Sequence, residues 1–111
     1  MKLLRYGPRG QEKPGLLDQD GNIRDLSGIV ADIDGKVLSD LSAIRAAKVE
    51  SLPIIDKGVR MAEPVARVGK FLCIGLNYSD HAAENGMAEP SEPIIFSKAT
   101  SAIIGPNDDV Y

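Results

Sequence analysis

A histidine and a glutamate lie three residues apart in the segment from Gly75 to Gly86 of this 111-residue chain. If residues 80–85 form a short helix, which Gly86 can end in a left-handed conformation, His81 and Glu84 face the same way, one helical turn apart. A carboxylate beside an imidazole fixes the orientation and tautomer of the ring and raises the basicity of its far nitrogen. Such a pair acts as a general base on water, so His81 and Glu84 are the candidate catalytic residues.

The same spacing has a second interpretation, in which His81 is a surface residue of a polar connecting helix and meets Glu84 by chance. A helix of fewer than two turns is not stable on its own in water. We therefore expect the segment to be mobile without substrate and to close as a lid that expels water. The spacing alone does not decide between a lid and a plain connecting helix.

Two other side chains could take part in chemistry. Lys98 follows the apolar run 94–96, and strand alternation places it on the same side as Phe96. Its ammonium could neutralise a substrate carboxylate, or it could be a solvated strand-end lysine whose stem lies on Phe96. Cys73, the only cysteine, lies in an apolar run, so we expect it to be buried and not to act as a nucleophile.

Adjacent carboxylates at Asp108 and Asp109 are a further candidate, for metal binding. Carboxylates in a loop are usually solvated, and no third ligand lies nearby in the sequence. We therefore expect both side chains to be solvated and predict no metal site in this chain.

The elements that position these residues follow from turn signals and apolar runs. Residues 3–6 predict a strand, and Asp20 followed by Gly21 predicts a hairpin between 15–17 and a strand from Ile23. A helix is expected to begin at Ser39 and Asp40, to end before Pro53 and to cover this sheet. Its apolar face would hold Leu41, Ile44 and Ala47. Two buried strands, 71–74 and 94–96, would flank the polar segment that holds His81.

Composition excludes several classes of protein. The chain is 43% hydrophobic and 26% charged, which is typical of a folded globular protein. Sixteen acidic and thirteen basic residues give a net charge of -3, and the scattered basic residues argue against nucleic-acid binding. Neither a signal peptide nor a transmembrane segment is indicated, so we expect a cytoplasmic protein without a membrane partner. We predict an N-terminal domain at residues 1–64 and a second domain, of which residues 65–111 are the beginning.

The run from Cys73 to Glu84, CIGLNYSDHAAE, resembles the fumarylacetoacetate hydrolase family. The runs EPIIFSK and SAIIGPND look like the strand and Gly-Pro turn that follow in that family. The opening residues, KLLRYGPRGQEKPGLLD and then IRDLSG, are similar to a bacterial branch often labelled ureidoglycolate lyase, which also includes diketo-sugar-acid hydrolases. The resemblance covers nearly the whole chain.

This resemblance implies an α+β fold in which a small N-terminal β-rich domain precedes the beginning of a mixed β-sheet roll that is truncated in this chain. It implies a homodimeric enzyme that uses Mg²⁺, or Mn²⁺ or Ca²⁺, and acts on a 2-oxo or 2,4-diketo acid. The metal ligands would come after Tyr111, so none is expected in this chain.

The resemblance also implies a role for individual residues. His81 looks like the lid base that activates water, and Glu84 like the carboxylate that orients it. Lys98, Asn77 and Tyr78 are assigned to substrate binding. Asn77 stands where the founding hydrolase has an acidic ligand, which favours the acylpyruvase-like or lyase branch.

Three functions follow as hypotheses. The first is a metal-dependent hydrolase that cleaves a carbon–carbon bond of a 2,4-diketo acid with water activated by His81. The second is a ureidoglycolate lyase, in which the same histidine moves a proton without forming a water nucleophile. The third is a non-catalytic binding or assembly module that contacts a partner through the polar loop at 77–86.

Overall fold

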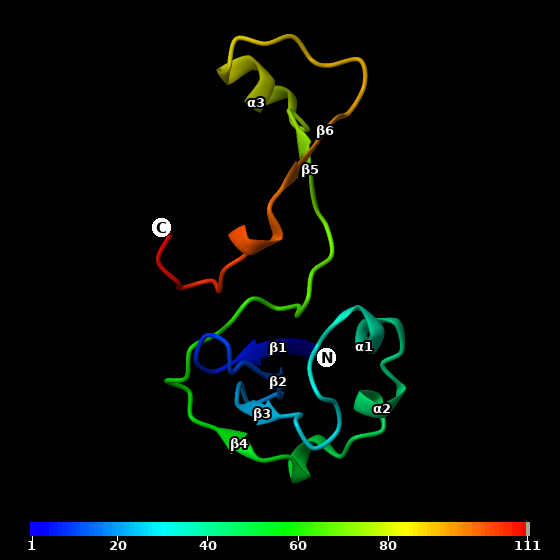
Figure 1. Cartoon of the computed structure of the whole chain (residues 1–111), viewed down its shortest axis with the longest axis vertical. Helices are drawn as coiled ribbons and strands as arrows, with labels where there is room; N and C mark the ends of the chain where they lie inside the picture. Colours follow the sequence, from blue (N-terminus) through cyan, green and yellow to red (C-terminus); the bar gives the residue numbers. More distant parts are fainter. Residues whose placement is uncertain (111) are drawn as a thin grey trace. The chain divides into compact units, whose positions relative to one another are not determined.

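The structure, a computed structural model, describes residues 1–110 and divides into two compact units (Figure 1). The first, called the N-terminal unit, comprises residues 1–68 together with 103–110. The second, called the inserted unit, is Gly69–Ala102. The predicted domain boundary at 64 and 65 stays a prediction, although residues 103–110 pack with the N-terminal unit and the sequence placed them in the second domain. The fold class is α+β, as predicted.

A four-stranded antiparallel sheet forms the centre of the N-terminal unit, with the order β1-β2-β3-β4. The first strand and the Asp-Gly hairpin predicted from the sequence are both confirmed. In the longest ladder, Leu4 lies opposite Gly15 and Tyr6 lies opposite Lys13. The strands are β1 (Lys2–Tyr6), β2 (Lys13–Leu17), β3 (Ile23–Asp25) and β4 (Ile54–Ile55).

The outer edge of β1 is covered by the chain that follows β4. The Gly7 amide donates to the Arg60 carbonyl at 3.0 Å, and the Ala62 amide donates to the Arg5 carbonyl at 2.9 Å. Tyr6 and Met61 form an antiparallel bridge between these two bonds. Because an uncovered edge strand is open to pairing with other chains, this return segment protects the sheet.

The hairpin between β2 and β3 turns on Asp18. Its carboxylate accepts hydrogen bonds from the amides of Asp20 and Asn22, at 3.0 and 2.8 Å. Gly21 has a φ of +76°, which is the left-handed region that favours glycine. The side chain of Asp18 therefore holds the turn that joins the two strands.

The helix predicted to begin at Ser39 and Asp40 forms, but it is only four residues long, and another short helix, which the sequence did not predict, precedes it. Helix α1 (Gly35–Ser39) begins at Asp34, whose carboxylate accepts from the Val37 amide at 3.0 Å. Asp40 ends α1 and then accepts from the Ser42 amide at 2.9 Å, which starts α2 (Ser42–Arg45). Two aspartates thus divide the region, and both bonds are local. Within residues 1–110, no helix is long and apolar enough to cross a membrane.

Two apolar clusters lie in the N-terminal unit. One contains Leu4, Tyr6 and Ile23. The other contains Leu16, Leu26 and Ile44, and Ile44 comes from α2. The prediction that a helix covers the sheet through Ile44 is therefore confirmed, although the helix is shorter than expected. A 3-10 turn, η1 (Val49–Ser51), leads from α2 towards β4.

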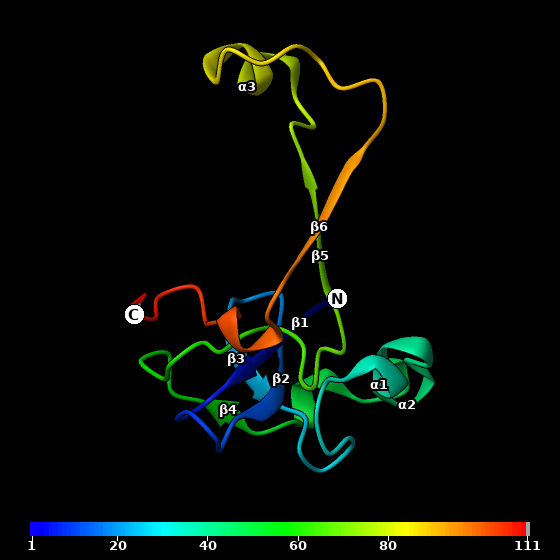
Figure 2. The same cartoon turned by 45° about the horizontal axis from the view of Figure 1, so that its top comes forward.

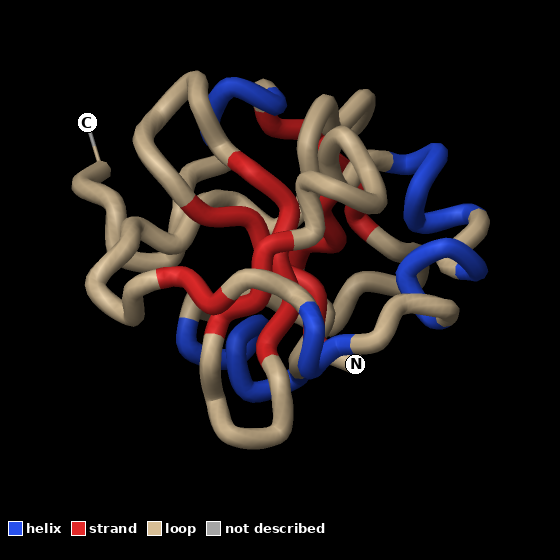
Figure 3. Tube along the Cα trace, turned by 90° about the horizontal axis from the view of Figure 1, so that it is seen from below, coloured by secondary structure: helices blue, strands red, loops and turns tan. Residues whose placement is uncertain are grey.

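The inserted unit is a β-ribbon with one helix. Strands β5 (Phe71–Gly75) and β6 (Ile94–Lys98) pair antiparallel, and helix α3 (Ser79–Glu84) lies between them in the sequence. Within this unit, α3 stands at one end of the ribbon and the 3-10 turn η2 (Thr100–Ala102) at the other (Figure 2). Loops and turns join the short elements of both units (Figure 3).

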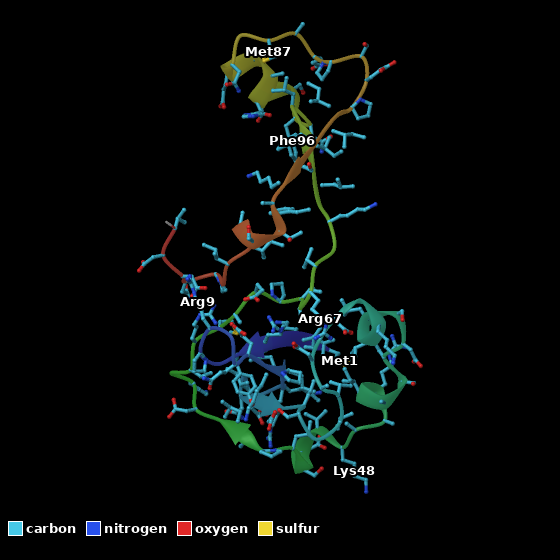
Figure 4. All side chains as sticks on the ribbon, viewed as in Figure 1. Met1, Arg9, Lys48, Arg67, Met87 and Phe96 are labelled. Carbon is cyan, nitrogen blue, oxygen red and sulfur yellow. The ribbon has the colours of Figure 1, made fainter. Side chains whose placement is uncertain are left out.

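The two predicted strands form, but the prediction that they are buried is wrong for the described residues. Leu72 is 63% exposed on β5, and Ile95 is 65% exposed on β6. Phe96, labelled in Figure 4, is 45% exposed. Two strands and one short helix cannot cover both faces of a ribbon, so its apolar side chains remain in contact with solvent.

Candidate functional site

Helix α3 carries the candidate catalytic pair and ends as the sequence predicts. Gly86 has a φ of +65°, and its amide donates to the Ala83 carbonyl at 3.0 Å. The Met87 amide then donates to the Ala82 carbonyl at 2.9 Å, which completes a glycine-terminated helix end. The helix begins at Ser79, one residue before the predicted start.

His81 and Glu84 lie on α3 three residues apart and are both exposed. Among residues 1–110, no hydrogen bond or ion pair joins their side chains. The His81 backbone is held instead, because its amide donates to the Asp80 carboxylate at 2.9 Å and its carbonyl accepts from the Asn85 side chain at 2.8 Å. The imidazole is therefore free to turn towards Glu84 or towards a bound molecule, and the catalytic assignment stays a prediction.

Asn77 lines an open depression of about 300 Å³ at the α3 end of the ribbon. The charged residues that line this depression are Glu89 and Glu92, and no cationic side chain lines it. The two carboxylates disfavour an anion, so we do not assign this depression by itself to an oxo acid. The remaining lining residues are Gly75, Leu76, Ser79, Pro90, Ser91 and Pro93.

Neither Lys98 nor Tyr78 lines this depression. Gly75 pairs with Ile94 at the α3 end of the ladder, whereas Lys98 pairs with Phe71 at the other end. At ~3.3 Å per residue, Lys98 is about 13 Å along the strand from the α3 end. Tyr78 precedes α3 and is 72% exposed. The described residues therefore do not bring the predicted substrate-binding side chains together, and their assignment remains untested.

The described part of the chain holds no group of three or more His, Cys, Asp or Glu side chains that could bind a metal ion. The expectation that Asp108 is solvated is wrong. Its side chain is 9% exposed and pairs with Arg60 at 2.6 Å. The Arg60 guanidinium, and then the Gly105 amide, hold the pKa of the Asp108 carboxyl well below its usual range. Asp109, by contrast, is exposed.

A buried ion-pair network, which sequence analysis missed, contains Asp108 and centres on Arg5. Arg5 is 5% exposed, and its guanidinium contacts Asp32 at 2.7 Å and Glu63 at 2.8 Å. The only signal of a buried cation in the sequence is an arginine between Leu4 and Tyr6 within a strand. This signal is weak, because a strand at a sheet edge with an exposed arginine has the same pattern. Its partners come from distant loops, so no local pattern identifies them.

A cavity of about 980 Å³ lies in the N-terminal unit between the β2–β3 turn and α2. Leu16 and Ile44 contribute to its apolar floor, while Lys2, Arg45 and Glu50 stand around it. None of the candidate site residues lines this cavity. Its mixed charges favour no single class of ligand, so we assign it no function.

The structure is similar to that of a fumarylacetoacetate hydrolase from the psychrophilic Exiguobacterium antarcticum, with a TM-score of 0.65 and 26% identity. The match covers 97% of this chain and 39% of that protein. The chain therefore has a fumarylacetoacetate hydrolase-like fold.

Relatives in sequence carry a less specific name. A protein of Burkholderia ambifaria named "Putative hydrolase" is 59% identical over 112 residues, and one of Burkholderia lata with the same description is 58% identical. Each match covers 99% of this chain, which spans 40% of the length of these relatives. No protein-family model matches the chain.

Proposed function

We propose that this chain is the N-terminal part of a hydrolase of the fumarylacetoacetate hydrolase family. Its substrate would be a 2,4-diketo acid, cleaved at a carbon–carbon bond by water. The observation that carries this proposal is the placement of His81 and Glu84, one helical turn apart and exposed, on the short helix between β5 and β6. The fumarylacetoacetate hydrolase-like fold supports it, as does the description of the relatives as hydrolases.

In this proposal, His81 takes a proton from water and Glu84 orients the imidazole. The two side chains are not bonded to each other here, so they would meet when the substrate is bound. A helix of this length gains little from its own hydrogen bonds, which makes such a rearrangement inexpensive. Closure of α3 over a substrate would also exclude bulk water from the reacting carbonyl.

A divalent cation, Mg²⁺ or else Mn²⁺ or Ca²⁺, belongs to the proposal for the longer polypeptide. The described residues hold no group of three or more His, Cys, Asp or Glu side chains, so its ligands would come mainly from the rest of that polypeptide. A chelated cation would polarise the carbonyl oxygens of a diketo acid. Removal of divalent ions with a chelator should abolish turnover of the full-length polypeptide, and added Mg²⁺ should restore it.

Substitution of the catalytic pair tests the proposal. In the full-length polypeptide, His81→Ala should lower kcat by about 100- to 10,000-fold, because a general base is lost. Glu84→Gln should lower kcat less and shift the acid limb of the pH profile, because it acts through His81. The matched control is Glu50→Gln, an exposed glutamate of η1, which should retain wild-type kinetics. Wild-type turnover in His81→Ala would remove the pair from the mechanism and favour a binding module.

Product analysis separates hydrolysis from the lyase alternative. A 2,4-diketo acid cleaved by water should yield two carboxylic acids and incorporate one ¹⁸O atom from labelled water into the acyl product. Ureidoglycolate should remain intact. Cleavage of ureidoglycolate to glyoxylate and urea, with no action on diketo acids, would replace the hydrolase proposal with the lyase one.

A further inference from the structure

The chain leaves the N-terminal unit after residue 68 and returns to it at residue 103, so the inserted unit has two crossings. The second crossing, where the chain returns to the N-terminal unit at residue 103, is fixed by a bidentate ion pair. Arg60 donates from Nε to Asp108 Oδ1 at 2.8 Å and from Nη2 to Asp108 Oδ2 at 2.6 Å. Such parallel bonds fix orientation as well as distance.

Close packing at Gly105 adds to this attachment. A Cβ atom built on Gly105 would lie 2.4 Å from the Met61 carbonyl oxygen and 3.2 Å from the Ala62 Cα atom. Only glycine allows the returning chain to approach so closely. The Gly105 amide also donates to Asp108 at 2.9 Å, so the packing and the ion pair act on the same few residues.

The first crossing is attached in a similar way. The Ala66 amide donates to the Ile33 carbonyl at 2.7 Å, and both residues are buried. Arg67, labelled in Figure 4, follows directly and forms an ion pair with Asp34. Arg67 has a φ of +53°, a region that non-glycine residues seldom adopt, so its conformation is imposed by these contacts.

The buried ion-pair network includes residues next to both attachments. Arg5 contacts Asp32, two residues before Asp34, and Glu63, three residues before Ala66. Arg60 contacts Glu12 at 3.2 Å, and Glu12 lies 3.9 Å from Arg5. Glu12 therefore links Arg60, which holds the second crossing, to Arg5, which lies beside the first.

The inserted unit needs such support. A two-stranded ribbon is marginally stable in water, and its apolar faces here are exposed. Holding both ends of a segment lowers the entropy cost of bringing its strands together. The attachments at the two crossings can thus stabilise the β5–β6 ladder without touching it.

We infer that Arg60 and Asp108 are positioning residues, which hold the second crossing and thereby keep the β5–β6 ladder, with the α3 segment that carries His81, in register. The attachment acts as a cross-link at the base of the ribbon. Its effect on order in the ribbon is independent of the proposed function, whereas its effect on catalysis depends on that function.

Amide hydrogen exchange on the 111-residue chain tests the inference. Asp108→Asn should speed exchange in peptides from residues 71–98 by about 10- to 100-fold, since loop closure is weakened, while β2 and β3 keep wild-type protection. Asp109→Asn is the matched control, because it makes the same change at the exposed neighbouring residue. Its amide exchange in residues 71–98 should equal that of the wild type. Faster exchange confined to 103–110 would overturn the inference, and so would equal behaviour of the two variants.

A second pair of variants leaves every charge in place. Gly105→Ala should displace the returning chain and speed exchange in 71–98 as Asp108→Asn does. Gly28→Ala is the control, since a Cβ there meets nothing within 4 Å and should have no effect. Arg60→Lys keeps the charge but loses the bidentate geometry. Its exchange rate in residues 71–98 should lie between those of the wild type and Asp108→Asn. Wild-type exchange in Gly105→Ala would contradict the inference even if Asp108→Asn failed to fold.

Kinetics of the full-length polypeptide separate the two proposals. Asp108→Asn should lower kcat more than it raises KM, and saturating substrate should restore the slow exchange of 71–98 if substrate orders α3. If the exchange results are as expected but the wild type acts on no diketo acid, the proposed function fails and the positioning role stands. If exchange is unaffected while His81→Ala abolishes turnover, the positioning role fails and the proposed function stands.

Discussion

Individual residues show how the N-terminal unit tolerates buried charge. Arg5 is 5% exposed, and an isolated cation at such a position would be costly. Its guanidinium donates to both oxygens of Asp32, at 2.7 and 3.1 Å, and also to Glu63. In the described residues, no buried side-chain nitrogen or oxygen lacks a hydrogen-bond partner. Removal of one carboxylate would therefore be more harmful than its bond alone suggests.

Tyr6 predicts a loss of stability in alkali. Burial, with a smaller contribution from Asp25, raises its pKa to about 12, compared with about 10 in the unfolded chain. Above pH 10 the unfolded state ionises while the folded state does not, so the free energy of unfolding should fall by about 1.4 kcal/mol per pH unit up to pH 12. Tyr6→Phe should remove this decline, as measured by urea unfolding between pH 9 and pH 12.

The control for this measurement is Tyr78→Phe, because Tyr78 is 72% exposed. It should show the same alkaline decline as the wild type. An unchanged decline in Tyr6→Phe would mean that other groups cause it.

At the level of helices and strands, local side-chain to backbone bonds define where elements begin and end. Asp34 begins α1, Asp40 separates α1 from α2, and Asp18 holds the β2–β3 turn. Each of these elements has five residues or fewer, so its own backbone hydrogen bonds contribute little. The aspartates and the packing of Ile44 supply the remainder.

Asp18 should make the hairpin sensitive to acid. Its ion pair with Arg24, at 2.8 Å, and the Asn22 amide lower its pKa to about 2. A carboxylate with a lowered pKa contributes stability above its unfolded pKa of about 4, and this contribution disappears as pH falls towards 2. Asp18→Asn should therefore be less stable than wild type at pH 7, and the difference should vanish between pH 4 and pH 2.

Asp20→Asn provides the comparison for Asp18→Asn. Asp20 lies in the same turn and is exposed, and its carboxylate makes no hydrogen bond to residues 1–110. Its stability should follow that of the wild type across the same pH range in thermal unfolding. A constant difference between Asp18→Asn and wild type down to pH 2 would show that the turn does not depend on the ionised carboxylate.

Across the molecule, buried apolar surface is concentrated in the N-terminal unit. Both apolar clusters belong to it, whereas Ala82 is the buried hydrophobic residue of the inserted unit among the described residues. The inserted unit instead exposes apolar side chains such as Leu72 and Ile95. The N-terminal unit therefore supplies most of the hydrophobic stabilisation of this chain.

Leu26→Ala tests this distribution. Leu26 is fully buried against Leu16 and Ile44, so the substitution should lower the free energy of unfolding by about 2–5 kcal/mol. Leu38→Ala, at a side chain that is 42% exposed, should cost about 1 kcal/mol or less. Urea unfolding monitored by far-UV circular dichroism would compare them. Equal midpoints for the two variants would contradict the assignment of the core.

Local sequence patterns accounted for every strand except β4, and for the Asp-Gly hairpin, the glycine-terminated α3 and the spacing of His81 and Glu84. These features depend on neighbouring residues, since strand alternation, turn chemistry and helical spacing act over a few positions. Helix α1 and the early end of α2 were missed, because Asp34 and Asp40 are both good helix-starting residues and sequence alone does not show that each starts its own short helix.

Contacts between distant residues required the folded chain. Arg60 meets Asp108, and Arg5 meets Asp32, only after the return segment pairs with β1 and the chain comes back at residue 103. Such pairs have no periodicity in sequence, because their geometry is set by the sheet and not by their neighbours. The exposure of β5 and β6 is likewise a property of what packs on them, which strand propensity cannot report.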